Sequence, residues 1–204
     1  MLFNFNLFYD NIQSVRHRIF IAINLTDDIK ERLLECQKKW PELPAHWTKI
    51  ENLHITLLFL GYLAEEDLPL VLEKTKELAL KQKPFSISLV KVVYGPPGKM
   101  PPRMIWAQGA GSKELGVLKE GLEKSLLEGG IKFSAEDRVF APHITLARIK
   151  TWEWRKIEPE ERPEVSEEIN LSFEVNSIEV MESKLKRGGP EYFILESAPL
   201  KTAS

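Results

Sequence analysis

A repeated tetrapeptide is the feature of this sequence that most constrains its fold. His-Ile-Thr-Leu occurs at residues 54–57 and again at residues 143–146, and the two copies contain two of the four histidines of the chain. Each copy lies in an apolar segment of strand length. Because alternate side chains of a β-strand point to the same face, each copy presents its histidine and threonine on one face. The repeat therefore predicts two similar lobes, each with one central strand that has a polar face and a buried face.

The remaining segments predict an α+β protein. Apolar runs and alternating patterns indicate strands, and apolar residues at helical spacing indicate helices that end at prolines or glycines. Thr26 and Ser112 are placed to cap two of these helices. The strands are expected at residues 18–25, 54–61, 85–94, 104–107, 143–149, 171–182 and 192–196, the helices at 27–40, 65–83 and 113–128, a short extended segment at 131–134 and a loop at 151–168. The strands and helices do not alternate regularly, which favours α+β over a doubly wound parallel sheet.

The composition argues against several classes of protein. The net charge of −2 offers no broad basic field for coating a nucleic-acid duplex, although a small basic site for one RNA end is compatible with it. The single cysteine, Cys36, excludes an internal disulfide and agrees with a reducing cytoplasm. Residues 1–9 lack the basic start and long apolar core of a signal peptide, and no apolar stretch is long enough to span a membrane. We therefore expect a cytoplasmic protein that does not bind membranes.

Two histidines that face each other suit acid–base chemistry near neutral pH. The ordinary histidine pKa of about 6.5 allows one ring to accept a proton while the other donates one. The hydroxyls of Thr56 and Thr145 are suited to holding phosphate oxygens between the rings. His54 and His143 would thus catalyse attack on a strained phosphodiester, and we expect no metal and no other cofactor. Zinc binding is the competing interpretation, but the sequence has no His-Glu-x-x-His motif and no cluster of cysteines and histidines.

These motifs resemble those of the two-histidine (2H) phosphoesterase superfamily, and specifically its RNA 2′,3′-cyclic phosphodiesterase branch, also called the 2′-5′ RNA ligase group. The resemblance covers residues 18–204, which we expect to form a single bilobal domain, and leaves residues 1–17 as an N-terminal extension. The segments that carry it are Phe20–Ile23, Asn52–Gly61, Pro102–Ala107 and Pro142–Arg148, together with Ser183, Leu185, Gly188 and Tyr192.

The resemblance implies both a fold and a reaction. The fold would be bilobal, with two antiparallel β-sheets that form a central cleft, helices on the outside and lobes related by a pseudo-twofold axis. The reaction would be hydrolysis of RNA ends that carry a 2′,3′-cyclic phosphate to a 2′-phosphate, with reversible 2′-5′ ligation as a second activity. It also implies that His143 activates water as the base and that His54 protonates the departing O3′ as the acid. We expect the protein to be a monomer.

Two further residues occupy matching positions, five residues after each histidine. The resemblance implies that Phe59 stacks on a base and that Arg148 contacts the substrate phosphate. In a regular strand, however, an odd offset points both side chains away from the histidine face. Either a bulge redirects them, or Phe59 belongs to the core and Arg148 is a surface charge.

Other segments leave alternatives open. Residues 148–156 interleave cations with two tryptophans, either as a platform for an RNA end or as a charged loop. His17 and His46 occur singly, and we expect them at the surface or in packing. Weaker candidates for a phosphate contact are Arg138, Lys184, Lys186 and Arg187. The competing functions are a 2H phosphoesterase acting on a small cyclic nucleotide or a 2′-5′ oligonucleotide, and an RNA-end binding or ligating protein with incidental hydrolysis.

Overall fold

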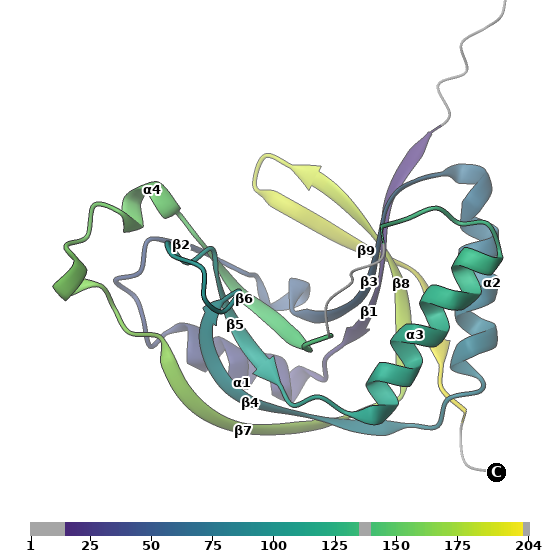
Figure 1. The fold of residues 1–204 in the computed structure, drawn as a ribbon, viewed down its shortest axis with the longest axis horizontal. Coiled ribbons are helices and arrows are strands. Elements are labelled where there is room, and N and C mark those ends of the chain that lie inside the picture. The colour runs from purple at the N-terminus through teal and green to yellow at the C-terminus, as the bar shows by residue number, and fades with distance from the viewer. Residues whose placement is uncertain (1–14, 135–139, 202–204) are drawn as a thin grey trace, which may run out of the picture.

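The computed structural model describes residues 15–134 and 140–201 (Figure 1). Residues 1–9 and Arg138, on which the sequence suggested interpretations, lie outside the described residues. The described part forms nine strands and four α-helices, which confirms the α+β class. The strands are β1 (Arg16–Asn24), β2 (Ala45–Trp47), β3 (His54–Ala64), β4 (Phe85–Gly95), β5 (Met104–Gly109), β6 (His143–Ile149), β7 (Ser166–Val175), β8 (Ser177–Lys186) and β9 (Gly189–Pro199).

The nine strands of the described residues form one antiparallel sheet that consists of two halves. The strand order is β7-β4-β5-β6-β3-β1-β8-β9, and β2 also pairs with β6. The half with β7, β4, β5 and β6 meets the half with β3, β1, β8 and β9 through one residue pair, Ile55 with Ile144. The two halves correspond to the two antiparallel sheets that were expected, but the two strands that carry the repeated tetrapeptide join them into one sheet at the centre of the molecule (Figure 1).

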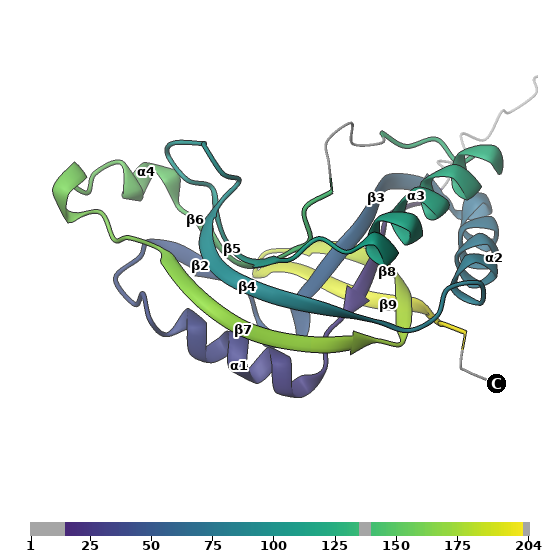
Figure 2. The same cartoon turned by 60° about the horizontal axis from the view of Figure 1, so that its bottom comes forward.

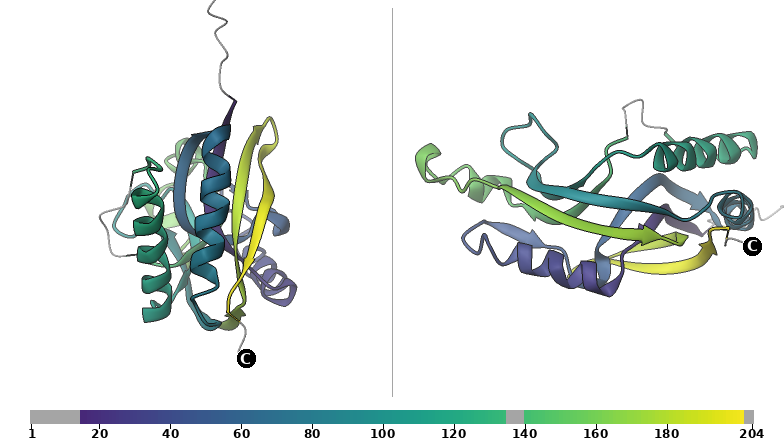
Figure 3. Two further views of the ribbon diagram at one scale, coloured as in Figure 1. Left: turned by 90° about the vertical axis from the view of Figure 1, so that its right-hand side faces the viewer. Right: turned by 90° about the horizontal axis from the view of Figure 1, so that it is seen from below.

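The helices cover the two halves in a crossed manner. They are α1 (Asp27–Gln37), α2 (Leu68–Ala79), α3 (Lys113–Glu128) and α4 (Thr151–Trp154). The helix that follows β1, α1, packs on β6 and β7 in the other half, whereas α3, which follows β5, packs on β3 and on α2. Figures 2 and 3 show α1 beside β7 and the α2–α3 pair at the opposite end. The strands are less interleaved, since one half consists of the consecutive strands β4 to β7, whereas β8 and β9 return to join β1 and β3 in the other half.

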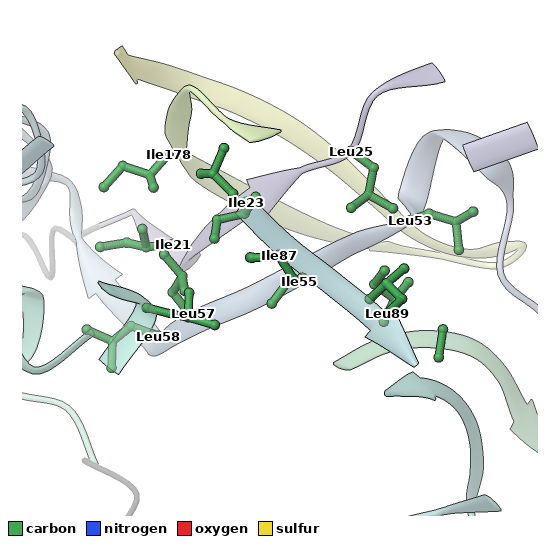
Figure 4. Close-up of a cluster of buried hydrophobic side chains, with 14 of the residues drawn as sticks. Ile21, Ile23, Leu25, Leu53, Ile55, Leu57, Leu58, Ile87, Leu89 and Ile178 are labelled. Atoms are coloured by element: carbon green, nitrogen blue, oxygen red, sulfur yellow. The ribbon is translucent and has the colours of Figure 1, made fainter. Parts of the chain in front are cut away.

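A shared hydrophobic core lies behind the repeated strands. Ile21 and Ile23 of β1, Ile55 of β3 and Leu89 of β4 are almost completely buried and belong to one cluster (Figure 4). The apolar run of β1 is continuous because the opposite face of this strand is buried as well, in a smaller cluster that includes Phe20. No helix within the described residues is long and apolar enough to cross a membrane.

The largest error of the sequence prediction concerns residues 171–182. These residues were expected as one strand, but they belong to two strands in different halves of the sheet. β7 pairs with β4, whereas β8 pairs with β1, and the chain passes from one to the other at Asn176. Both segments are rich in alternating apolar residues, so the local pattern carries no sign of the break.

Smaller differences occur at the ends of helices and in loops. The first helix ends at Gln37, and Trp40 lies beyond it, buried in the hydrophobic core with its indole Nε1 donating to the Glu164 carbonyl (2.9 Å). Thr26 occupies the N-cap position of α1 without a side-chain capping bond, whereas the Ser112 hydroxyl accepts from the α3 backbone as predicted. The loop expected at residues 151–168 contains α4, a short 3-10 helix at Pro159–Glu161 and the start of β7, and residues 131–134 form no strand.

Candidate active site

The strand β3 contains a β-bulge directly after its His-x-Thr motif. Thr56 pairs with Ala22 of β1, but the neighbouring Ile21 pairs with Leu58, so β3 has one extra residue at this point. Leu57 and Leu58 are consequently both buried, although adjacent residues of a regular strand point to opposite faces.

The strand β6 contains the same bulge at the same distance from its histidine. Thr145 pairs with Trp106 of β5 and Ala147 pairs with Ile105, which leaves Leu146 as the extra residue. Leu146 and Ala147 are both buried. From each histidine onward, β3 and β6 therefore show the same order of buried and exposed positions over the 7 residues of β6.

The bulge of β3 turns Phe59 toward the histidine face. Phe59 pairs with Phe20 across the β1–β3 ladder, and the two rings are stacked with centroids 6.5 Å apart. The Phe20 ring in turn lies 5.1 Å from the imidazole of His54. Phe59 is 45% exposed and is absent from the core, so the alternative in which a bulge redirects it is correct.

The bulge of β6 has the same effect on Arg148. This residue pairs with Met104 of β5, and Arg148 Nη1 and Thr145 Oγ1 each lie 3.9 Å from Met104 Sδ. Arg148 and Thr145 thus share one face of β6, which is also the face of His143. A cation that is exposed beside the histidine and the threonine is available to an anionic ligand.

The pairing of β3 with β6 brings the two motifs together. Ile55 lies opposite Ile144 in an antiparallel register. Continued by one residue in each direction, this register sets His54 opposite Thr145 and Thr56 opposite His143. The two histidines also interact electrostatically, because the charge of His143 contributes to lowering the pKa of His54.

Each imidazole is oriented by the carbonyl two residues before it. His54 Nδ1 donates to the Asn52 carbonyl oxygen (2.8 Å), and His143 Nδ1 donates to the Ala141 carbonyl oxygen (2.9 Å). A neutral ring with its proton on Nδ1 has an unprotonated Nε2, which is the nitrogen that can exchange a proton with a substrate. His54 Nε2 lies 3.1 Å from Thr56 Oγ1. The same backbone device thus holds both rings in the same tautomer.

The rings around the two imidazoles differ. His54 contacts both Phe20 and Tyr192, which also contact each other with centroids 5.2 Å apart, and the Tyr192 ring meets His54 edge-on at 5.1 Å and 89°. His143 is stacked on the indole of Trp106, with centroids 3.9 Å apart and an interplanar angle of 26°. The imidazole of His54 is therefore part of a three-ring cluster with residues of β1 and β9, whereas that of His143 lies flat on a ring from β5.

The surroundings of His54 strongly favour its neutral form. Burial away from water lowers the pKa of His54 to about 4, the hydrogen bond to the Asn52 carbonyl opposes this effect, and the charges of His143 and Lys30 lower the pKa further. At pH 7 the free protein therefore carries a neutral His54.

Three residues on this face had no assigned role in the sequence interpretation. Trp106 and Tyr192 belong to the segments of the family resemblance but were given no function. His46 lies on β2 opposite Arg148, and it is exposed while its neighbours Ala45 and Trp47 pack on the core. No sequence signal pointed to His46, because β2 is only three residues long and was not predicted.

Other predicted candidates lie away from the two motifs. Trp154 is buried and Trp152 is exposed with Lys156 over its ring, so only one tryptophan of residues 148–156 is available as a platform. Lys184 pairs with Glu182 (3.2 Å) near the β8–β9 turn. A hollow between α1 and β7, lined by Arg32, Cys36 and Glu167 among others, is also separate from the histidines. His17, expected at the surface or in packing, is only partly exposed and contacts Glu182 (2.7 Å).

Comparison with known proteins finds relatives that match most of this chain. A family model described as LigT like Phosphoesterase matches residues 23–106 and 108–192. A curated protein from Thermus thermophilus, named RNA 2′,3′-cyclic phosphodiesterase, is 33% identical over 193 residues, which is 90% of this chain and 90% of that protein. A protein of the same name from Archaeoglobus fulgidus is 33% identical over 86% of this chain and 96% of its own length.

Solved structures share the fold. A crystal structure of a Thermus thermophilus protein has a TM-score of 0.79 and 31% identity, and the match covers 90% of this chain and 98% of that chain. The crystal structure of E. coli LigT complexed with 3′-AMP has a TM-score of 0.70 and 25% identity, over 92% of this chain and 100% of that chain.

Proposed function

The chain belongs to the LigT-like phosphoesterase family, and on this premise we propose that it hydrolyses 2′,3′-cyclic phosphates at RNA ends to 2′-phosphates. The observation that carries the proposal is the pair of His-x-Thr motifs on two adjoining strands with identical bulges and identically held imidazoles. Two relatives that match most of this chain bear the name RNA 2′,3′-cyclic phosphodiesterase, which supports the same substrate.

In the proposed reaction, His143 is the base and His54 is the acid. The oxygen of a water molecule attacks the phosphorus and gives its proton to His143 Nε2. The bond between phosphorus and O3′ breaks, and O3′ takes a proton from His54 Nε2. The products are a 2′-phosphate and a free 3′-hydroxyl, and the histidines return to their starting states by exchanging protons with water.

The low pKa of His54 places a condition on this division of roles. An acid must be protonated before it acts, but His54 is neutral in the free protein at pH 7. A bound phosphodiester anion near the ring favours the charged imidazolium and so raises the pKa of His54. We therefore propose that His54 is protonated together with substrate binding, so that it becomes an acid only when the anion is present.

The remaining predicted site residues would bind the substrate. The hydroxyls of Thr56 and Thr145 would donate to the non-bridging phosphate oxygens, and Arg148 would add a charge-assisted hydrogen bond. The exposed ring of Phe59 would stack on the base of the terminal nucleotide. Ligation would be the same chemistry in reverse, with a 5′-hydroxyl replacing water.

We further propose that residues 18–204 act as one catalytic domain, as a monomer in the cytoplasm. The first described strand, β1, begins two residues earlier, at Arg16, and its first residues pair with the end of β3. The residues next to the predicted boundary therefore belong to the same sheet as the site.

The activity is tested with an oligoribonucleotide that ends in a 2′,3′-cyclic phosphate, incubated with and without EDTA. We expect complete conversion to a 2′-phosphate at equal rates in both reactions. The product is identified by its mass and is distinguished from the 3′-phosphate isomer by comigration with synthetic standards. A 3′-phosphate product, or loss of activity in EDTA, would contradict the proposal.

A further inference from the structure

We propose that a stripe of aromatic and basic side chains along β1 and β3 binds the RNA chain upstream of the cyclic phosphate, so that the substrate is an oligonucleotide end rather than a small cyclic nucleotide. We call Arg18, Phe20, Phe59 and Tyr62 the β1–β3 stripe. The inference rests on the proposed function, because it extends the binding site of the same reaction.

The pairing of β1 with β3 places these residues in successive cross-strand pairs, here called ranks, on the histidine face. From the site outward, Asn24 pairs with His54, Phe20 pairs with Phe59, and Arg18 pairs with Tyr62. The β1 members of the ranks are separated by even numbers of residues, so they share one face of β1. The stripe therefore begins at the catalytic histidine and runs continuously away from it.

The two β3 members of the stripe are exposed aromatic rings. Phe59 is 45% exposed and Tyr62 is 61% exposed, whereas Phe20 beneath them is buried. An exposed ring on a strand offers a flat surface to a base, and stacking of this kind accepts any base. Phe59 and Tyr62 therefore provide successive stacking surfaces on the side of the site that holds His54.

Arg18, the cross-strand partner of Tyr62, supplies positive charge beside the Phe59 ring. Its guanidinium lies 4.7 Å from the centroid of the Phe59 ring, and Nη1 donates to Ser183 Oγ at 3.1 Å. A guanidinium has five N–H donors in a planar fork, so this anchored side chain is well suited to bind a phosphate as well. Arg16 is exposed two residues further along the same strand and face.

The spacing of the ranks fits a nucleotide chain. The step from the Phe20–Phe59 rank to the Arg18–Tyr62 rank is two residues of β1, or about 7 Å along the strand. One extended nucleotide spans such a distance. With the terminal base on Phe59, the next phosphate would lie near Arg18 and the next base on Tyr62.

The opposite exit from the site is less favourable. On the other half, Trp152 is as exposed as Tyr62 and, like Phe59, has a cation over its ring, but it lies on α4 beyond the end of β6. The β1–β3 stripe lies on the strand that carries His54 and on its partner β1, so we assign the upstream RNA to the stripe.

The test compares three substrates that end in a 2′,3′-cyclic phosphate: a mononucleotide, a dinucleotide and a pentanucleotide. We expect the wild-type kcat/KM to rise with length. We expect Tyr62→Ala to lower the ratio of kcat/KM for the pentanucleotide to that for the mononucleotide about tenfold, from the loss of one stacked base. Tyr62→Phe should retain the wild-type ratio, because it keeps the ring.

Phe193→Ala is the matched control. Phe193 is 44% exposed, close to the exposure of Phe59, but it pairs with Glu182, whose β1 partner Ile19 faces the core and not the site. This variant should retain both the ratio and the activity. An equal ratio in the wild type and Tyr62→Ala, or a loss in Phe193→Ala as large as in Tyr62→Ala, would overturn the inference.

A second measurement separates the inference from the proposed function. Binding of a fluorescent pentanucleotide that already ends in a 2′-phosphate is followed by anisotropy, which requires no turnover. Hydrolysis of all three substrates at equal kcat/KM would refute the stripe and leave the proposed function intact. If no substrate is hydrolysed, the proposed function fails, and about tenfold weaker binding by Tyr62→Ala would still support the stripe.

Discussion

The two halves of the sheet hold their histidines in the same way but surround them differently. In both halves, the carbonyl two residues before the histidine accepts from its Nδ1, and a threonine follows on the same face. A bulge then turns the residue five positions after the histidine toward the site. His54 contacts the rings of Phe20 and Tyr192, whereas His143 is stacked on Trp106. The repeated motif thus determines where the imidazoles lie, and the neighbouring strands determine their chemical environment.

This difference shows how a near-symmetric frame can support an asymmetric reaction. A general acid and a general base must start in opposite protonation states. Two identical motifs in identical surroundings would give two histidines of the same pKa. Burial away from water lowers the pKa of His54 to about 4, so this histidine is neutral in the free protein, and in the proposed reaction it takes up its proton only together with the bound anion.

The largest expected effect is the loss of either histidine. His54→Ala and His143→Ala should each lower kcat by at least about a thousandfold on a cyclic-phosphate oligonucleotide, because acid and base act in one step. The double variant should be only slightly worse than either single variant, since each single loss already stops the concerted transfer. The rates are measured under single-turnover conditions.

His17→Gln is the control for these variants. His17 lies on β1 with Glu182 as its partner, away from both motifs, and should keep full activity. A single variant that retains more than about a tenth of the wild-type rate would show that the two halves do not act as one unit.

The next effect is a dependence of stability on pH that His54 provides. Its pKa is about 4 in the folded protein and 6.5 in its ordinary state, so between these values the unfolded chain binds more protons. The contribution of His54 to the free energy of unfolding should therefore be fully present above pH 6.5. It should be lost as the pH drops toward 4, which lowers the free energy of unfolding by at most about 3 kcal/mol.

Urea denaturation of the wild type and of His54→Gln across this range isolates the contribution of His54. Carboxylates titrate in both proteins, so their effect cancels in the difference. We expect the difference in unfolding free energy to decrease steadily as the pH falls from 6.5 to 4. Parallel curves would show that the pKa of His54 is the same in the folded and unfolded protein.

The sequence was sufficient for the two strands, their shared faces and the class of the fold. These depend on local alternation, which is visible in residues 54–57 and 143–146. The bulges at Leu57 and Leu146 were not predictable, because a bulge is defined by its partner strand. The same reason explains the missed break at Asn176, where local alternation continues although the pairing partner changes.

The side chains that surround each histidine could be predicted even less well than the bulges. Trp106 comes from β5 and Tyr192 from β9, and only the folded sheet brings these rings to His143 and His54. The unequal surroundings of two identical motifs follow from such contacts between distant segments. A local pattern therefore predicted which residues to propose as reactive, but not how their surroundings differ.

An intermediate effect compares the residues that the two bulges bring to the site. Arg148→Ala should lower kcat/KM by about 10- to 100-fold through loss of a charge-assisted hydrogen bond, and Phe59→Ala by about tenfold through loss of stacking. Only the Arg148 effect should shrink at high salt, because screening weakens the charge but not the stacking. Arg32→Ala, in the hollow between α1 and β7, is the control, and equal salt dependence of the Arg148→Ala and Phe59→Ala variants would contradict different roles.

The smallest effect tests whether the indole under His143 acts as its support. A Cβ added at Gly95 would overlap the ring of Trp106, so Gly95→Ala should displace this ring and lower kcat about tenfold, a cost of about 1.4 kcal/mol. Gly116→Ala, where a Cβ meets open space on α3, is the matched control and should leave kcat unchanged.

A double variant tests whether Gly95 acts through Trp106. In a Trp106→Leu background the clash is relieved, so adding Gly95→Ala should lower kcat little further. This non-additivity would link Gly95 to His143 through Trp106. Additive losses would instead indicate that Gly95 does not act on His143 through the Trp106 ring.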